Sequence, residues 1–375
     1  MTDRYGLPYM GSKSKIARWV VERLPEGDTL YDVFCGGCAI TDYAMRARKY
    51  KSYVVNDITN IGYVFKKALD GGFKNETRWI DRKTYFEELE DPYAYICFSF
   101  GNNPVCRYAY AVELEPWKKA LHWCYVFNDP SLMHEYGVDI PVCDDKAGYR
   151  KWIRNNETYI RERYCAWVNA HRAEIEGKTG LRIRDERLGR LQRLEDLQSL
   201  QSLQSLQSLE DLQKLQRLKD SGTLESLDRL QRLKDLGTLE SLDRLQRLKD
   251  SLHILQGDYR DVVIPKSSGV VYCDPPYRNT ASYYDMEGGE KRDLTKTFDY
   301  DGFYAWCEYQ SYVNRNPVFV SSYDLPSSKF RRVASVDKGS SLHGGANHCD
   351  DKIEGLYVPK EQDCDLVDYV QVKLF

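Results

Sequence analysis

Short runs of mainly apolar residues recur at both ends of the chain. They cover residues 29–34, 53–57, 269–273 and 317–324. Apolar runs of about four to eight residues bounded by turn residues are typical of strands buried in a parallel sheet. Other strand-like segments are 92–103 and 366–374, and residues 342–357 are a glycine-rich loop before a further strand. Helical patterns cover Ile16–Leu24, a stretch from about Thr41, and one after 298–306. The pattern predicts an α/β fold.

The middle of the chain has a different pattern. Leucine recurs at every third position from 191 to 218 and, in the same phase, from 224 to 248, and residues 222–235 are repeated identically at 237–250. The repetition indicates tandem duplication. On an α-helix this spacing rotates successive leucines by about 60°, so they would circle the helix instead of lining one face. Composition favours short helices broken at the repeated glycine, whereas the strict period favours a compact solenoid. We prefer the solenoid and interpret the segment as a spacer or self-association module.

Composition and charge narrow the classes of protein. With 54 basic and 57 acidic residues, the chain has no overall positive field that would indicate nucleic acid, so any such contact must be local. No apolar run is long enough for a membrane span and the first residues lack an apolar signal core, so we expect a cytoplasmic protein with no membrane contact. Cys35 and Cys38 have C-x-x-C spacing, but no second pair or nearby histidines complete a zinc site. We expect no metal, and reduced cysteines.

Two strands with a turn between them form a nucleotide-binding pattern. The run 29–34 leads into Cys35-Gly36-Gly37-Cys38, whose small residues allow a ligand close to the backbone before a helix begins. The next strand ends in Asp57, where an acid bonds ribose hydroxyls in Rossmann-like folds. The G-x-G-x-x-G fingerprint is absent, which argues against NAD, and Asp32 before the turn suits a cationic or zwitterionic ligand. A βαβ unit without a ligand is the alternative.

The tetrapeptide Asp274-Pro275-Pro276-Tyr277 follows the apolar run 269–273. The prolines stop the strand and lack backbone donors, so nearby carbonyls can accept hydrogen bonds from a ligand. A carboxylate, a backbone acceptor and an aromatic ring at the carboxyl end of a strand suit an amine on a flat ring. The alternative is a turn that only ends the strand.

Four elements in order resemble the Dam-type DNA adenine-specific N6-methyltransferases (class D12, alpha group) of phages and bacteria. Tyr9-Met10-Gly11-Ser12-Lys13 resembles the family's aromatic-x-Gly-Gly-Lys loop, residues 32–38 its D-x-F-x-G-x-G element, Gly257-Asp258-Tyr259 its G-D-[FY] element, and Asp274–Tyr277 its D-P-P-Y motif. Ser12 and Cys38 replace glycines of the family pattern, and Lys352–Leu356 is similar to a late family element.

The resemblance implies a Rossmann-like S-adenosylmethionine-dependent methyltransferase core. It implies that the cofactor is bound by Tyr9, Met10, Gly11, Lys13, Asp32, Phe34, Gly36, Asp57, Asp258 and Tyr259. Within this set, Asp57 would hold the ribose, and Asp258 and Tyr259 the cofactor's adenine. Asp274, Pro275, Pro276 and Tyr277 would be catalytic: Asp274 and the Pro275 carbonyl hold the amine of a flipped-out adenine, while Tyr277 stacks on its ring.

The motifs also divide the chain. We predict a core of residues 1–74 and 254–375, a target-recognition domain at 75–185, and the leucine period-three insert at 186–253. Arg107 and Tyr108 belong to a C-R-Y segment similar to one in family members, which implies contact with bases or phosphates. The basic, aromatic stretch 149–163 fits equally a helix that follows the DNA backbone and an ordinary solvated helix.

The motifs together predict methyl transfer from S-adenosylmethionine to the adenine N6 amine in double-stranded DNA. The alternatives are an RNA base-amine methyltransferase and a catalytically silent DNA-binding module. The acids Asp32, Asp57, Asp258 and Asp274 argue against silence. The target sequence stays open, and so does a restriction–modification partner, because no nuclease signature stands out.

Overall fold

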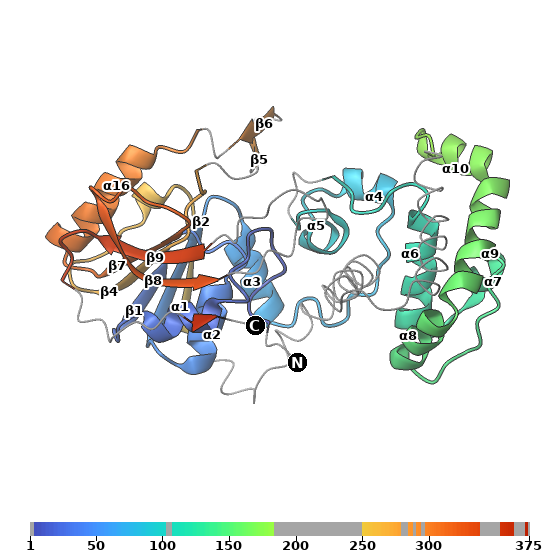
Figure 1. Cartoon of the computed structure of the whole chain (residues 1–375), viewed down its shortest axis with the longest axis horizontal. Helices are drawn as coiled ribbons and strands as arrows, with labels where there is room; N and C mark the ends of the chain where they lie inside the picture. Colours follow the sequence, from blue (N-terminus) through green and yellow to red (C-terminus); the bar gives the residue numbers. More distant parts are fainter. Residues whose placement is uncertain are drawn as a thin grey trace, which may run out of the picture. The chain divides into compact units, whose positions relative to one another are not determined.

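The chain divides into two compact units, Met1–Lys74 with Gln231–Phe375, and Asn75–Leu230 (Figure 1). The computed structural model describes residues 4–102, 107–183, 250–278, 284–287, 290–293, 297–337, 353–363 and 372–373. Apart from its last residues, the predicted leucine-repeat insert lies outside the described part of the chain. The solenoid and the roles assigned to the predicted domains stay predictions.

The first unit is built on a sheet of eight strands in the order β10-β8-β9-β7-β4-β1-β2-β3. Its strands are β1 (Thr29–Asp32), β2 (Ser52–Asp57), β3 (Leu252–Gln256), β4 (Gly269–Cys273), β7 (Val318–Ser322), β8 (Phe330–Asp337), β9 (Ile353–Pro359) and β10 (Val372–Lys373). The strands from β3 to β7 are parallel, and β9 runs antiparallel to β7 and β8. The predicted α/β fold is therefore confirmed, with a mostly parallel sheet.

The order of the strands reverses between β1 and β4. From β1 the chain continues to β2 and β3 on one side, whereas β4 and β7 lie on the other. The backbone N–H of Val33, just after β1, donates to the carbonyl of Tyr272 in β4 at 3.0 Å. This register brings the ends of β1 and β4 to the same edge. In open α/β sheets, ligands bind at such a switch point.

Helices cover both faces of this sheet. The helices are α1 (Ala17–Arg23), α2 (Ala39–Ala47), α3 (Ile61–Leu69) and α16 (Tyr300–Glu308), with a short 3-10 turn at Tyr259–Asp261, a π turn at Tyr309–Val313 and a hairpin of β5 (Tyr284–Glu287) and β6 (Glu290–Asp293). Phe303 and Cys307 of α16 share a buried cluster with Val271 of β4. Tyr53 of β2 donates its hydroxyl to Ala44 of α2. Tyr53 pairs with Leu30 and Val271 with Tyr31, so the two helices lie on opposite faces.

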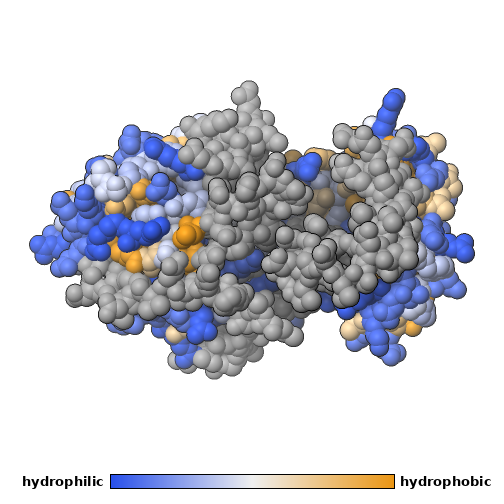
Figure 2. All heavy atoms as spheres, viewed as in Figure 1, coloured by the Kyte–Doolittle hydropathy of each residue, from blue (hydrophilic) through white to orange (hydrophobic). Residues whose placement is uncertain are grey.

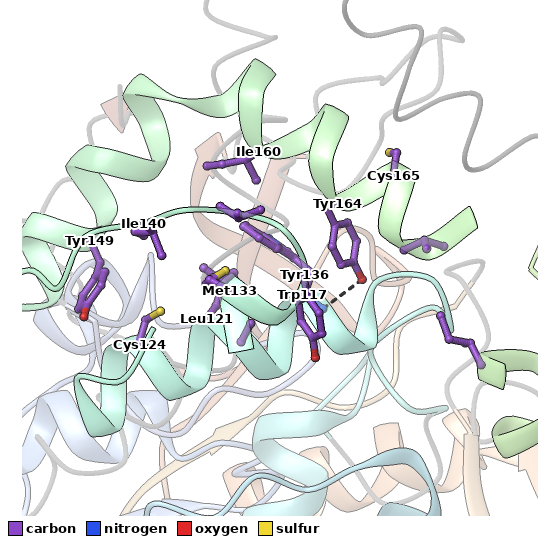
Figure 3. Packing of buried hydrophobic residues seen from close by; sticks show 14 of the residues in the cluster. Trp117, Leu121, Cys124, Met133, Tyr136, Ile140, Tyr149, Ile160, Tyr164 and Cys165 are labelled. Atoms are coloured by element: carbon purple, nitrogen blue, oxygen red, sulfur yellow. Dashed lines mark hydrogen bonds between the residues drawn. The ribbon is translucent and has the colours of Figure 1, made fainter. Parts of the chain in front are cut away.

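The described part of the second unit is mainly helical. It contains α4 (Arg82–Glu87), α5 (Pro92–Phe98), α6 (Glu115–His122), a π turn (Trp123–Phe127), α7 (Ser131–Glu135), α8 (Lys146–Asn155), α9 (Glu157–Ala170) and α10 (Arg172–Thr179). Buried side chains of α6, α7 and α9 meet in one cluster around Trp117, Met133 and Tyr164 (Figure 3). The Tyr164 hydroxyl accepts from the Trp117 N–H at 3.1 Å and donates to the Glu113 carbonyl at 2.8 Å, which joins α9 to the start of α6.

Two predictions for this unit are wrong. Residues 92–98 form helix α5, not a strand: the Asp91 side chain caps it by accepting from the Tyr93 N–H at 3.0 Å, and Pro92 occupies its first turn. All its residues from Tyr93 onward are buried, so their pattern could not distinguish the two structures. The stretch 149–163 is not one helix but parts of α8 and α9, which meet at Asn156.

On the face drawn in Figure 2, the described residues at the surface are mainly polar. Hydrophobic side chains on that face lie in small separate areas. No helix in the described ranges is long and apolar enough to cross a membrane.

Candidate active site at the switch point of the sheet

The N-terminal loop lies against the turn that follows β1. The Leu7 N–H donates to the Gly37 carbonyl at 2.7 Å, and the Gly6 N–H donates to the Asp42 carboxylate at 2.6 Å. Gly6 has φ +65°, and a Cβ there would lie 2.2 Å from the Gly37 oxygen, so only glycine fits. A Cβ at Gly36 would meet the Tyr9 ring at 3.4 Å. The structure thus brings together Tyr9 and Gly36, which the sequence predicted for one ligand.

Cys38 occupies a backbone conformation that favours glycine. Its φ is 56°, and it precedes the first residue of α2. The backbone explains why glycine is usual at this position of the motif. Cys35 and Cys38 both contact the Gly36 carbonyl through their sulfur atoms, at 3.7 and 3.8 Å. The pKa of the Cys35 thiol is raised by its hydrogen bond to Cys38 and by burial, which disfavours the reactive thiolate form. No metal-binding cluster of at least three ligand residues occurs in the described part of the chain.

Asp32 is a buried carboxylate at the end of β1. One of its oxygens accepts the Thr41 hydroxyl at 2.7 Å, and the other, Oδ1, has no hydrogen-bond partner among the described residues. Burial raises the pKa of Asp32 to about 7; the Thr41 hydrogen bond opposes this, and the nearby Asp274 and Asp57 carboxylates add to it. A buried acceptor that lacks a partner, among like charges, suits a cationic donor.

Asp57 holds the shape of the same turn from the end of β2. Its carboxylate accepts the Gly36 N–H at 3.0 Å and the Thr59 N–H and hydroxyl at 3.0 and 2.8 Å. Asp57, which was predicted to bind ribose, therefore holds the backbone of the glycine turn in this structure.

The Gly257-Asp258-Tyr259 element divides into a half-buried acid and a buried ring. Both oxygens of Asp258 accept from the Arg260 guanidinium at 2.8 Å, and this partner lowers the pKa of Asp258. The Tyr259 ring is buried with its centroid 5.4 Å from that of Phe34, and its hydroxyl has no partner among the described residues. Phe34 and Tyr259, both predicted to contact the cofactor, thus lie together.

Asp274 lies just after β4 and has two close partners. Its Oδ2 is 2.7 Å from the Lys13 Nζ, and its Oδ1 accepts the Tyr277 hydroxyl at 2.9 Å. The Lys13 Nζ is 4.8 Å from the centroid of the Tyr277 ring, which contacts Tyr323 edge to face. The first and last motifs of the chain therefore meet in an ion pair, a contact that the sequence did not reveal.

Glu354 is a site residue that we did not predict. It lies in β9 with a side chain that is 0% exposed. It accepts a short hydrogen bond from the Tyr277 hydroxyl, and its Oε1 is 3.8 Å from the Lys13 Nζ. Burial alone would lower the pKa of Lys13, but Asp274 and Glu354 outweigh burial and raise it. The only signal was the similarity of Lys352–Leu356 to a late family element, which does not identify Glu354 as buried.

A small pocket adjoins the two prolines of the tetrapeptide. It is lined by Pro275, Pro276, Arg278, Tyr300, Phe303, Tyr304, Ser322, Asp324 and Leu325. The Arg278 guanidinium is 4.5 Å from the Tyr300 ring centroid. The pocket therefore offers aromatic faces beside Pro275 and Pro276, at the end of β7.

Other predicted residues lie outside this cluster. Gly11 is exposed, and a Cβ there would contact nothing within 4 Å; Met10 beside it is half-buried. In the second unit, Arg107 is exposed, with its guanidinium 4.9 Å from the Phe100 ring centroid. Tyr108 is buried and donates its hydroxyl to the Ile80 carbonyl at 2.8 Å. Its ring therefore supports the segment from inside, and Arg107 is the exposed member of the pair.

Comparison with known proteins agrees with the motifs. Residues 9–96 match the family model of the D12 class N6 adenine-specific DNA methyltransferases. Over 62 residues the chain is 44% identical to the Type II methyltransferase M2.HphI of Haemophilus parahaemolyticus. These 62 residues are 16% of this chain and 18% of that relative. The matched stretch thus spans about a fifth of the relative's length. The predicted resemblance to the D12 class is confirmed.

The backbone at Cys38 generates a stability prediction. Cys38→Gly removes the left-handed strain of about 1–2 kcal/mol but loses a buried thiol and adds chain entropy, so we expect the free energy of unfolding to change by less than about 1 kcal/mol. Cys38→Val keeps φ positive with a β-branched side chain and should destabilise by about 2 kcal/mol or more. Denaturant unfolding of both variants tests this, and equal effects of the two substitutions would contradict it.

Proposed function

We propose that this chain transfers a methyl group from S-adenosylmethionine to the N6 amine of adenine in double-stranded DNA. The observation that carries the proposal is the meeting of two motifs at one edge of the sheet. Asp32 ends β1 just before the glycine turn, Asp57 ends β2, and Asp274 follows the neighbouring strand β4. The family match of residues 9–96 includes the glycine turn and supports its assignment. The D-P-P-Y tetrapeptide lies outside the matched residues and supports the same function by its resemblance to the family motif.

The residues at the glycine turn fit S-adenosylmethionine. The Asp32 Oδ1 atom is a buried acceptor that lacks a partner among the described residues, as a ligand with positive charge requires. Gly36 and Tyr9 provide a close backbone and an aromatic face, and Tyr259 has a hydroxyl available beside Phe34. When bound, S-adenosylmethionine supplies an electrophilic methyl group on a sulfonium centre.

Asp274 and the Pro275 carbonyl would hold the adenine amine. The base must leave the duplex to reach them, because its amine is otherwise paired. Two acceptors at the amine hydrogens direct the nitrogen lone pair away from the protein, toward the methyl donor, and such placement supplies much of the rate. The Asp274 carboxylate also stabilises the positive charge that develops on the nitrogen. Tyr277, held by Asp274 and Glu354, would offer its ring to the base.

The second unit would recognise the target sequence. Arg107 is exposed on a loop whose inner face is anchored by the buried Tyr108. Helix α8 carries Lys146, Arg150, Lys151 and Arg154 and has no acid within its bounds. A basic helix of this kind suits DNA phosphates. We propose that residues 75–185 act as the target-recognition domain and that the protein acts in the cytoplasm.

Methyl transfer from tritiated S-adenosylmethionine tests the proposed function. We expect label in the adenine of unmethylated duplex DNA and none in RNA. Asp274→Asn and Asp274→Ala should each lower the rate by about 10²-fold or more, because the amine loses its charged acceptor. Asp28→Asn is the matched control, since the Asp28 side chain is 73% exposed and lies away from the site.

The other outcomes of this assay separate the alternatives. Label in RNA alone would keep the chemistry and replace the substrate. No label in either nucleic acid from a folded protein that binds S-adenosylmethionine would support a silent DNA-binding module.

Cofactor affinity should depend on pH through Asp32. With a pKa of about 7, this carboxyl group is mostly protonated below that pH, and only its charged form attracts a cation. Affinity for S-adenosylmethionine should therefore rise from pH 5.5 toward 7.5, and at pH 6 it should be about ten-fold below the plateau. Titration calorimetry measures it. Asp32→Asn should bind weakly with no such slope, and a wild-type affinity that is constant over this range would contradict the assignment.

A further inference from the structure

The ion pair between Lys13 and Asp274 occupies the group that the proposed reaction needs. Lys13 Nζ lies 2.7 Å from Oδ2 of Asp274, and the Tyr277 hydroxyl lies 2.9 Å from Oδ1. Both oxygens of the carboxylate thus have a donor within hydrogen-bond distance. An incoming amine can add its own hydrogen bond at full strength only if one of these donors gives way.

Of the two donors, Lys13 is the cation, and it has a second carboxylate, that of Glu354, close to it. Its Nζ is 3.8 Å from the Oε1 atom of Glu354, and a shift of about 1 Å would bring the two to the ~2.8 Å of a charge-assisted hydrogen bond. The side chains of Lys13 and Glu354 are 7% and 0% exposed, so water cannot replace a lost partner of the ammonium. A buried cation that left Asp274 without a second carboxylate would be strongly disfavoured.

The Tyr277 hydroxyl connects the two carboxylates. It lies within hydrogen-bond distance of both Asp274 and Glu354, and it has one proton to donate. When the Lys13 ammonium is on Asp274, the Tyr277 hydroxyl can donate its hydrogen bond to Glu354. When the Lys13 ammonium moves to Glu354, the Tyr277 hydroxyl can donate to Asp274 instead. Each carboxylate then keeps a donor, and the Tyr277 ring keeps its position.

We propose that Glu354 is a positioning residue that receives the Lys13 ammonium when a base amine takes its place on Asp274. In this exchange Lys13 is a built-in substitute for the substrate amine: it holds the charge of Asp274 before the base arrives. Glu354 touches neither the base nor the methyl donor. The inference rests on the proposed function, because it assumes that Asp274 accepts an amine.

A double-mutant cycle separates the exchange from a purely structural role of Glu354. The readouts are kcat/KM for unmethylated genomic DNA and, separately, the Kd for S-adenosylmethionine. Glu354→Gln removes the second charge, so Lys13 stays on Asp274; we expect kcat/KM to fall about ten-fold or more, with the cofactor Kd unchanged within about two-fold. Glu308→Gln, a partly exposed partner of Lys329, is the matched control and should leave both values unchanged.

The Lys13→Met background gives the decisive comparison. Once the ammonium is absent it needs no second carboxylate, so Glu354→Gln should then lower kcat/KM by less than about three-fold. If Glu354 only supported Tyr277 or β9, the loss would be the same in both backgrounds, and the exchange would be overturned. A changed cofactor Kd in Glu354→Gln would equally overturn it, because the role would then lie in the cofactor site.

A second variant keeps the test valid if Glu354→Gln does not fold. Glu354→Asp retains the charge at a shorter reach and should give a smaller loss that also disappears with Lys13→Met. A loss that persists in that background would overturn the exchange. Wild-type protein without DNA methyl transfer would overturn the proposed function itself, and the exchange with it, whereas active wild type with equal losses in both backgrounds overturns the exchange alone.

Discussion

The pairing of β1 with β4 is the constraint on which the site depends. Thr29–Asp32 lies in parallel register with 269–272, and the Val33 N–H donates the next hydrogen bond to the Tyr272 carbonyl. Strands far apart in the sequence therefore end at one edge, where the strand order reverses. Asp32 ends one strand and Asp274 follows the other. Without this register the two halves of the proposed site would belong to unrelated surfaces.

Buried charge is the second feature of the site. Asp32, Asp274 and Glu354 bring negative charge to this edge, and Lys13 supplies a buried positive charge among them. Burial, together with the nearby Asp274 and Asp57 carboxylates, raises the pKa of Asp32, so a cationic ligand would stabilise its charged form. Lys13 and Asp274 instead compensate each other, so this part of the site is stable before a substrate arrives. The proposed cofactor half and the proposed substrate half of the edge thus differ in charge.

Local patterns predicted the parts of the fold that depend on local sequence. The strands β1, β2 and β4 followed from short apolar runs, and the glycine turn followed from small residues after β1. Helix α5 was missed because its residues are buried on all sides, so no periodicity distinguished it from a strand. Strand β3 was missed because it follows directly on the leucine repeat, whose pattern masked the alternation of Leu252–Gln256.

The site could be predicted by residue type but not by contact. The motifs identified Lys13, Asp274 and Tyr277, yet the ion pair between the first two depends on the sheet and on the path of the N-terminal loop. Glu354 was missed because a single acid in a strand gives no sign of burial until β9 is inserted between β7 and β8. Tyr108 looked like a base contact, but its burial depends on the helical packing of the second unit.

The central claim is that this edge of the sheet methylates the adenine amine of DNA. Nucleoside mass spectrometry of a plasmid grown with this protein, in a host without its own adenine methylation, tests that claim directly and needs no knowledge of the target sequence. The account predicts N6-methyladenine with the wild type and a strongly reduced amount with Asp274→Asn. Plasmid DNA without N6-methyladenine despite folded, cofactor-binding protein, or with methyl groups on cytosine only, would contradict it.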